Sequence, residues 1–125
     1  MNKPPVLFHG TTRDIYDEAL RVFGVYKFLV ETVGLKYDYS TAFGSALMRG
    51  HVYNGLVLLV VDPEKATGFR RTPFYECEAL DRDSYQIVDI KFDGSALSDE
   101  TKTDIERAKT TLKNPGLRLV RKQGE

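Results

Sequence analysis

Three short segments of the sequence combine residue types that could bind and transform a ligand. They are Phe8-His9-Gly10-Thr11-Thr12, Tyr37-Asp38-Tyr39-Ser40-Thr41-Ala42 and Glu76-Cys77-Glu78. A glycine directly after a histidine lets the main chain approach a ligand closely. Alternate residues of a strand face the same side, so the two carboxylates of the third segment can point into one cleft.

Each of these residues also has a purely structural interpretation. His9 could hydrogen-bond a neighbouring carbonyl, since histidine is often partly or fully buried. Tyr39 could be a core aromatic residue, and Ser40 or Thr41 could only cap a helix. The two glutamates of the third segment could form the solvated face of an edge strand. No single segment is specific, so the argument depends on their combination.

The composition excludes several classes of protein. The chain has 125 residues, and 18 Lys and Arg residues balance 18 Asp and Glu residues. Zero net charge argues against a generic basic nucleic-acid-coating protein. One cysteine and two histidines exclude a disulfide framework and make a Cys- or His-based metal site improbable, so we expect no metal. No apolar run approaches the roughly 20 residues of a membrane span, and the start lacks a signal peptide, so we expect a cytoplasmic protein.

The first half of the chain reads as alternating short helices and strands. A strand at 6–8 is followed by a helix that Thr11 or Thr12 caps and Gly24 ends. The pattern then predicts a short helix at 25–33, a half-buried strand at 35–39, and a helix that begins at Ser40 or Thr41 and ends near Gly50.

The second half is richer in strands. The run at 56–61 is apolar on both faces, which predicts a central strand. Strands at 74–80 and 85–92 are expected to be joined by the polar turn at 81–84. Ser98 opens a polar surface helix that reaches Lys113, and a last strand is expected at 117–120. The whole chain, residues 1–125, is therefore expected to form one α+β domain.

Taken in order, the three segments resemble the ADP-ribosyltransferase superfamily, whose members split NAD between nicotinamide and ribose and pass ADP-ribose to an acceptor. His9-Gly10-Thr11 is similar to the His-Gly-Ser/Thr motif of the poly(ADP-ribose) polymerase and RNA 2′-phosphotransferase branches. Tyr39-Ser40-Thr41-Ala42 resembles the Ser-Thr-Ser motif of the arginine-modifying toxin branch. Glu76-Cys77-Glu78-Ala79-Leu80 resembles the toxin Glu-x-Glu strand, with its hairpin return at 85–89. The toxin branch carries Arg in place of His9, and Gln86 lacks the carboxylate often found there in the polymerase branch.

The resemblance implies a small α+β domain with split, antiparallel-rich sheets and N-terminal helices, and it implies NAD as co-substrate. Cleavage of the nicotinamide–ribose bond develops oxocarbenium character, as in glycoside cleavage. Glu78 would stabilise that charge, and Glu76 would orient or deprotonate the acceptor nucleophile.

The resemblance also assigns the groups that bind NAD. The Gly10 backbone would bind the nicotinamide amide and His9 a ribose hydroxyl, and Thr11, Arg13 or another nearby basic residue would meet the pyrophosphate. The imidazole at position 9, the phenol at 39 and the acid at 78 would then meet around a single hollow. Tyr39 would stack on the nicotinamide, and Ser40 would help to fix Glu78.

Two other functions stay open. The chain could be a non-enzymatic protein-binding module on the same fold, or an RNA-end enzyme similar to the RNA 2′-phosphotransferases. For the transferase, the macromolecular acceptor, protein or nucleic acid, is not indicated by the sequence. Cys77, inside an expected strand, is interpreted as a buried structural thiol.

Overall fold

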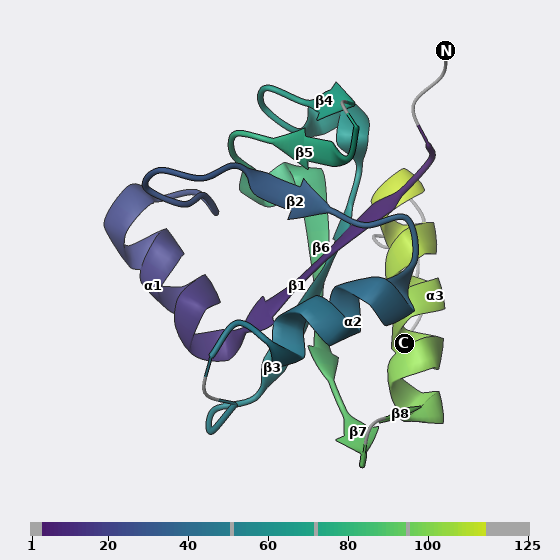
Figure 1. Cartoon of the computed structure of the whole chain (residues 1–125). Helices are drawn as coiled ribbons and strands as arrows, with labels where there is room; N and C mark the ends of the chain where they lie inside the picture. Colours follow the sequence, from purple (N-terminus) through teal and green to yellow (C-terminus); the bar gives the residue numbers. More distant parts are fainter. Residues whose placement is uncertain (1–3, 51, 72, 95, 115–125) are drawn as a thin grey trace, which may run out of the picture.

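The computed structural model of this chain describes residues 4–50, 52–71, 73–94 and 96–114. Strand β3 (Leu56–Val61) occupies the centre of the larger sheet, as its apolar sequence predicts. Its neighbours are β1 (Leu7–Thr12) and β6 (Tyr85–Ile90), both antiparallel to it (Figure 1). All six residues of β3 are buried because both faces of this sheet are covered.

A second sheet packs against one face of the first. It consists of β2 (Val33–Leu35), β5 (Tyr75–Cys77) and β4 (Arg70–Arg71), in that order. The two sheets are joined where Phe8 and Lys36 exchange two main-chain hydrogen bonds, of 2.9 and 2.6 Å. In Figure 1 β2 lies at an angle to β1, and the segment that follows β2 crosses in front of β1 on its way to α2. The split, antiparallel arrangement is an α+β fold, as expected.

Two hydrophobic clusters lie on the two faces of the β1-β3-β6 sheet. The cluster between the sheets contains Leu7 and Leu59 from the large sheet and Val33 from the small one. The opposite cluster contains Phe8 and neighbouring side chains, under helices α2 (Tyr39–Leu47) and α3 (Asp99–Lys113). Because side chains alternate along β1, consecutive residues of this strand belong to different clusters.

The ends of the helices follow local capping rules. Thr12 caps helix α1 (Arg13–Phe23) by accepting the Ile15 amide hydrogen at 3.1 Å, and Gly24 ends it with a φ of 75°. Ser98 caps α3 in the same way. The predicted caps are confirmed at these two helices.

The cap of α2 differs from the prediction. Asp38, not Ser40 or Thr41, is the cap: it accepts the Thr41 amide hydrogen at 2.8 Å, so the cap lies two or three residues earlier than predicted and the helix begins at Tyr39. A carboxylate at this position also suits the positive end of the helix dipole.

The helix expected at 25–33 does not form. Tyr26 instead pairs with Leu80 through two main-chain hydrogen bonds of 3.1 and 2.9 Å, which hold this segment beside the second sheet. The β-branched residues of the segment also disfavour a helix. The strand expected at 35–39 is displaced toward the N-terminus, because β2 ends at Leu35 and only the Lys36 bridge continues it.

The expected hairpin return between the strands at 74–80 and 85–92 is also wrong. Both segments contain strands, but β5 pairs with β2 and β4, whereas β6 pairs with β3. The 3₁₀ turn η2 (Arg82–Ser84) carries the chain from one sheet to the other, and η1 (Pro63–Lys65) follows β3. The strand expected at 117–120 lies outside the described residues.

A small hairpin completes the described fold. Strands β7 (Phe92–Asp93) and β8 (Ala96–Leu97) lead from β6 into α3. The apolar stripe of α3 packs on the large sheet through Ile105, Ala108 and Leu112. Within the described ranges, no helix has the length and apolar character needed to cross a membrane.

Candidate functional site

His9 is a buried, neutral cross-link between three segments. Its side chain is 1% exposed. Nδ1 donates to the Gly34 carbonyl at 2.7 Å, so Nε2 must accept from the Tyr26 hydroxyl, also at 2.7 Å. Burial lowers the pKa of His9 from 6.5 to about 3, because it penalises the charged ring. The carbonyl-binding interpretation of His9 is confirmed, and both ring nitrogens are already occupied by protein groups.

Gly10 is the point at which β1 touches helix α2. A Cβ atom at this position would overlap the main-chain carbonyl of Ala42, so only glycine allows this approach. The main-chain groups of Phe8 point to the outer edge of β1, where they pair with Lys36. Those of Gly10, two residues later, point to the same edge. The Gly10 carbonyl accepts a hydrogen bond from Arg49 Nε at 3.1 Å.

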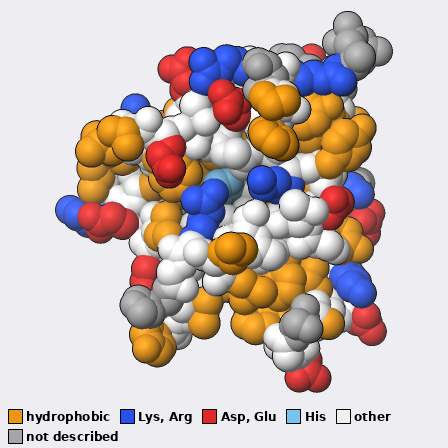
Figure 2. Space-filling model, in the orientation of Figure 1, with side chains coloured by type: hydrophobic (Ala, Val, Ile, Leu, Met, Phe, Trp, Pro, Cys, Tyr) orange, Lys and Arg blue, Asp and Glu red, His pale blue; other side chains and the backbone are white. Residues whose placement is uncertain are grey.

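We call this part of the surface the Gly10 hollow and define it by five neighbouring residues: His9, Gly10, Phe28, Lys36 and Arg49. Figure 2 shows histidine surface at its bottom, with Lys or Arg side chains on either side. His9 lies beside Phe28, with ring centres 6.0 Å apart. The Arg49 guanidinium stacks over the Phe28 ring at 5.1 Å. The charges of Arg49 and Lys36 add to the effect of burial in lowering the pKa of His9.

Arg49 was not identified from the sequence as a functional residue. It follows the end of α2, and no motif around it signals a ligand. Its position becomes meaningful because α2 packs directly on Gly10, which brings the guanidinium over the edge of β1. The available sequence signal was a cationic residue just after a helix, where that helix packs on a strand that contains glycine.

Thr11 does not face the hollow. It is completely buried, and its hydroxyl lies near the Tyr26 hydroxyl in the core. It shares the inner face of β1 with His9, toward the core between the sheets. The structure therefore does not place Thr11 where it could contact a pyrophosphate at the surface.

Tyr39 and Ser40 lie on the other side of the large sheet from His9. The Tyr39 ring packs edge-on against Phe8, with ring centres 6.1 Å apart, in the cluster beneath α2. Because Phe8 and His9 are consecutive in β1, Tyr39 and His9 are on opposite faces of the sheet. The expected meeting of these two residues around one hollow is wrong, and the core-aromatic interpretation of Tyr39 fits. Ser40 is exposed on α2.

Glu76 lies in the middle of the second sheet and is already paired. Its carboxylate accepts hydrogen bonds from Arg70 at 2.8 Å and from the Thr32 hydroxyl at 3.2 Å. Val33 faces the core, so its neighbour Gly34 and the opposing Glu76 face outward.

Glu78 follows the end of β5, where its amide donates to the Thr67 carbonyl at 2.8 Å. Its exposed side chain lies against Gly68, and in the described part of the chain its carboxylate forms no ion pair. Between the two acids, Cys77 is buried, which raises the pKa of its thiol to about 12. Glu78 is thus the carboxylate available to a ligand, whereas Glu76 is held in place.

No family model and no curated protein matches this chain. The site must therefore be interpreted from its own geometry. The described residues contain no group of three or more His, Cys, Asp or Glu side chains placed to hold a metal ion. What the Gly10 hollow offers is a main-chain edge, two cations and an aromatic ring.

Proposed function

We propose that this chain is an NAD-dependent mono-ADP-ribosyltransferase that binds NAD in the Gly10 hollow. The observation that carries the proposal is the Gly10 carbonyl, which points to an open strand edge and is held by Arg49 instead of a neighbouring strand. A main-chain edge presents an amide donor and a carbonyl acceptor. These complement the carboxamide of nicotinamide, which has one acceptor oxygen and a donor NH₂ group.

The surroundings of Gly10 suit the rest of a dinucleotide. Arg49 and Lys36 supply positive charge for a pyrophosphate, and a guanidinium can bind phosphate oxygens in pairs. The Phe28 ring supplies a flat face for stacking, in a place where Tyr39 cannot. On NAD binding the carboxamide replaces Arg49 at the Gly10 carbonyl, which releases the guanidinium toward the phosphates.

The reaction breaks the bond between the ribose C1′ and the pyridinium nitrogen. The bonding electron pair leaves with nicotinamide, which becomes neutral, and C1′ acquires oxocarbenium character. A carboxylate beside C1′ stabilises this charge, and Glu78 is the candidate because it forms no ion pair among the described residues. The acceptor nucleophile then bonds to C1′ and gives its proton to Glu76, which Arg70 positions.

His9 acts in this proposal as a positioning residue. It binds the carbonyl of Gly34, which is the register partner of Glu76 across the sheet. The imidazole therefore links the edge at Gly10 to the strand that carries the acids. A reducing cytoplasmic compartment, in which Cys77 stays a thiol, fits the proposal.

The test is calorimetric titration with NAD, combined with chromatography of released nicotinamide. We expect binding that Arg49→Ala weakens roughly ten- to a hundredfold, the range for a hydrogen bond to a charged group. Arg107→Ala is the matched control, because Arg107 is exposed and paired with Asp104 on α3.

Absence of both NAD binding and nicotinamide release would contradict the proposal and favour a non-enzymatic binding module. Release of phosphate from 2′-phosphorylated RNA, without NAD cleavage, would instead favour an RNA-end enzyme.

A further inference from the structure

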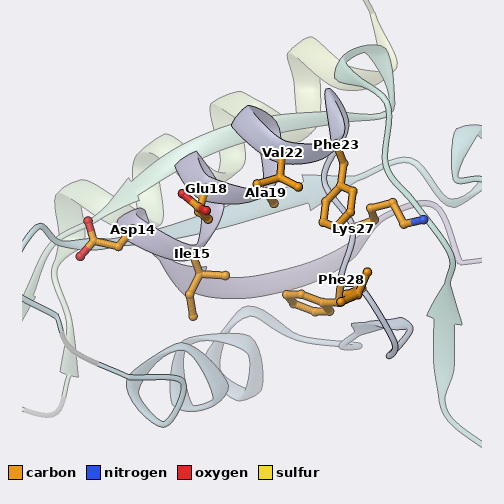
Figure 3. A pocket seen from close by; sticks show the side chains of 9 residues that line it. Asp14, Ile15, Glu18, Ala19, Val22, Phe23, Lys27 and Phe28 are labelled. Carbon is orange, nitrogen blue, oxygen red and sulfur yellow. The ribbon is translucent and has the colours of Figure 1, made fainter.

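A second concave surface lies on helix α1, outside the Gly10 hollow. The cavity has a volume of about 520 Å³ and separates the helix from the segment at 27–29 (Figure 3). We call it the α1 groove, and most of its lining is apolar: Ile15, Ala19, Val22, Phe23, Phe28 and Leu29. Apolar surface gathered in a groove is one feature of interaction sites, and the neighbouring side chains extend it.

Exposed apolar side chains project beside the groove. Leu29 is 80% exposed and Val30 is 91% exposed, and both lie in the segment that forms one wall. Val22, on the opposite wall, is 51% exposed. One face of the protein therefore carries both an apolar protrusion and an apolar groove of matching character.

The charges around the groove are arranged with opposite signs at its two ends. Asp14 and Glu18 lie toward one end, where Glu18 is paired with Arg21 and Asp14 accepts a hydrogen bond from the Asn54 side-chain amide, so Asp14 supplies the net negative charge there. Lys27 lies at the other end beside Phe23 (Figure 3). A two-fold axis through the middle of the groove would reverse a second copy. Lys27 of each copy would then face the acidic end of the other.

We propose that the α1 groove is the interface of a symmetric homodimer of this chain. The protrusion at 29–30 of one copy enters the groove of its partner, and the two-fold axis repeats the contact in reverse. Adjacent, complementary features on one face are what an isologous interface requires. The opposite charges at the groove ends select the antiparallel arrangement of the two α1 helices. Phe28 borders both surfaces, but the proposed dimer depends on no group that the proposed reaction requires, and its tests measure mass and not NAD binding.

The first test is sedimentation velocity of the full chain over a range of protein concentrations. We expect a concentration-dependent species of twice the chain mass, which Leu29→Glu converts to monomer. Phe74→Glu is the control, because Phe74 is 72% exposed but does not line the groove. A chain that stays monomeric at about 100 µM, well above the micromolar range of weak specific association, would overturn the proposal. A dimer that persists in Leu29→Glu would also overturn it.

The second test distinguishes this geometry from other dimers. Lys27→Glu places acids together at each end of the interface, and Asp14→Lys places two cations together, so each variant alone should be monomeric. Asp14 is the suitable partner because it forms no ion pair among the described residues, whereas Glu18 is paired with Arg21. An equimolar mixture of the two variants restores opposite charges at both ends and should form a heterodimer. Failure of the mixture to associate, while the parent chain dimerises, would overturn the antiparallel arrangement.

Discussion

His9 donates its Nδ1 hydrogen to the carbonyl of Gly34 at 2.7 Å, across 25 residues of chain. Its other nitrogen accepts from Tyr26, so one ring fixes the first strand against two later segments. Such a ring must be neutral, because a protonated Nε2 could no longer accept a hydrogen bond. The histidine of the His-Gly-Thr motif therefore has a structural task that can be measured apart from any activity.

Replacing this ring should destabilise the fold. His9→Ala leaves the Gly34 carbonyl and the Tyr26 hydroxyl without partners and opens a cavity, so we expect a loss of about 2–5 kcal/mol in the free energy of unfolding. Urea denaturation followed by circular dichroism measures it. Tyr26→Phe removes one of the two bonds and should cost about 1–2 kcal/mol. Equal losses in the two variants would contradict the bridging role.

Stability should also depend on pH through His9. Its pKa is about 3 in the folded protein and 6.5 ordinarily. Between these values the unfolded chain binds a proton that the folded protein does not, so protonation favours unfolding. The stability that comes from keeping His9 neutral is fully present above pH 6.5. It is lost as the pH falls from 6.5 toward the pKa of His9 in the folded protein, about 3. Lowering the pH from 7 to 5 should cost about 2 kcal/mol, measured by urea denaturation at each pH.

The control for this pH effect is His9→Gln, which has no titrating group at position 9. This variant should lose little stability over the same pH interval, even if it is less stable than the parent throughout. A loss as large as that of the parent chain would show that other groups cause the effect.

Two glycine substitutions should have opposite effects. Gly10→Ala places a methyl group against the Ala42 carbonyl and should cost about 1–3 kcal/mol, as overpacking does. Gly44→Ala, in the interior of α2, meets no atom within 4 Å and should stabilise the helix by up to about 1 kcal/mol. Thermal unfolding midpoints of both variants check this, and a harmless Gly10→Ala would contradict the close packing of β1 on α2.

Substitutions of Glu78 and Glu76 should have different effects on the kinetics of the proposed reaction. Glu78→Gln should lower nicotinamide release by roughly 10²–10³ while leaving the unfolding midpoint unchanged, because it removes a preorganised charge from an exposed side chain. Glu76→Gln should slow transfer to an acceptor and also lower stability slightly, since it breaks the pair with Arg70. Rapid-quench assays with NAD measure the first effect. Turnover by Glu78→Gln equal to that of the parent would remove Glu78 from the reaction.

Tyr39→Ala should affect stability more than ligand affinity. The ring packs against Phe8 on the face away from the Gly10 hollow, so its loss should cost about 2–3 kcal/mol of folding energy. The NAD dissociation constant, measured by calorimetry well below the unfolding temperature, should stay within about twofold of the parent. A tenfold weaker affinity would mean that Tyr39 contacts the ligand after all.

Local rules of sequence were sufficient for some elements of this fold. The uninterrupted apolar run of β3 and the caps at Thr12 and Ser98 depend on neighbouring residues, and they were predicted. The segment at 25–33 and the partner of β5 depend on contacts between distant residues, such as Tyr26 with Leu80, and were predicted incorrectly. Arg49 was missed for the same reason, because only the packing of α2 on Gly10 gives it a role.

The backbone contact between Gly10 and Ala42 has a mechanical consequence. It locks strand and helix into one stiff unit, so the carbonyl of Gly10 and the stem of Arg49 keep a constant spacing. A large ligand at the proposed NAD site would therefore have to displace the segment on the opposite side, which carries Phe28. That segment is held by the main-chain hydrogen bonds between Tyr26 and Leu80. A disulfide engineered across the Tyr26–Leu80 contact would hold this segment more firmly. It would limit the size of the ligands that can bind, without changing any residue that contacts them.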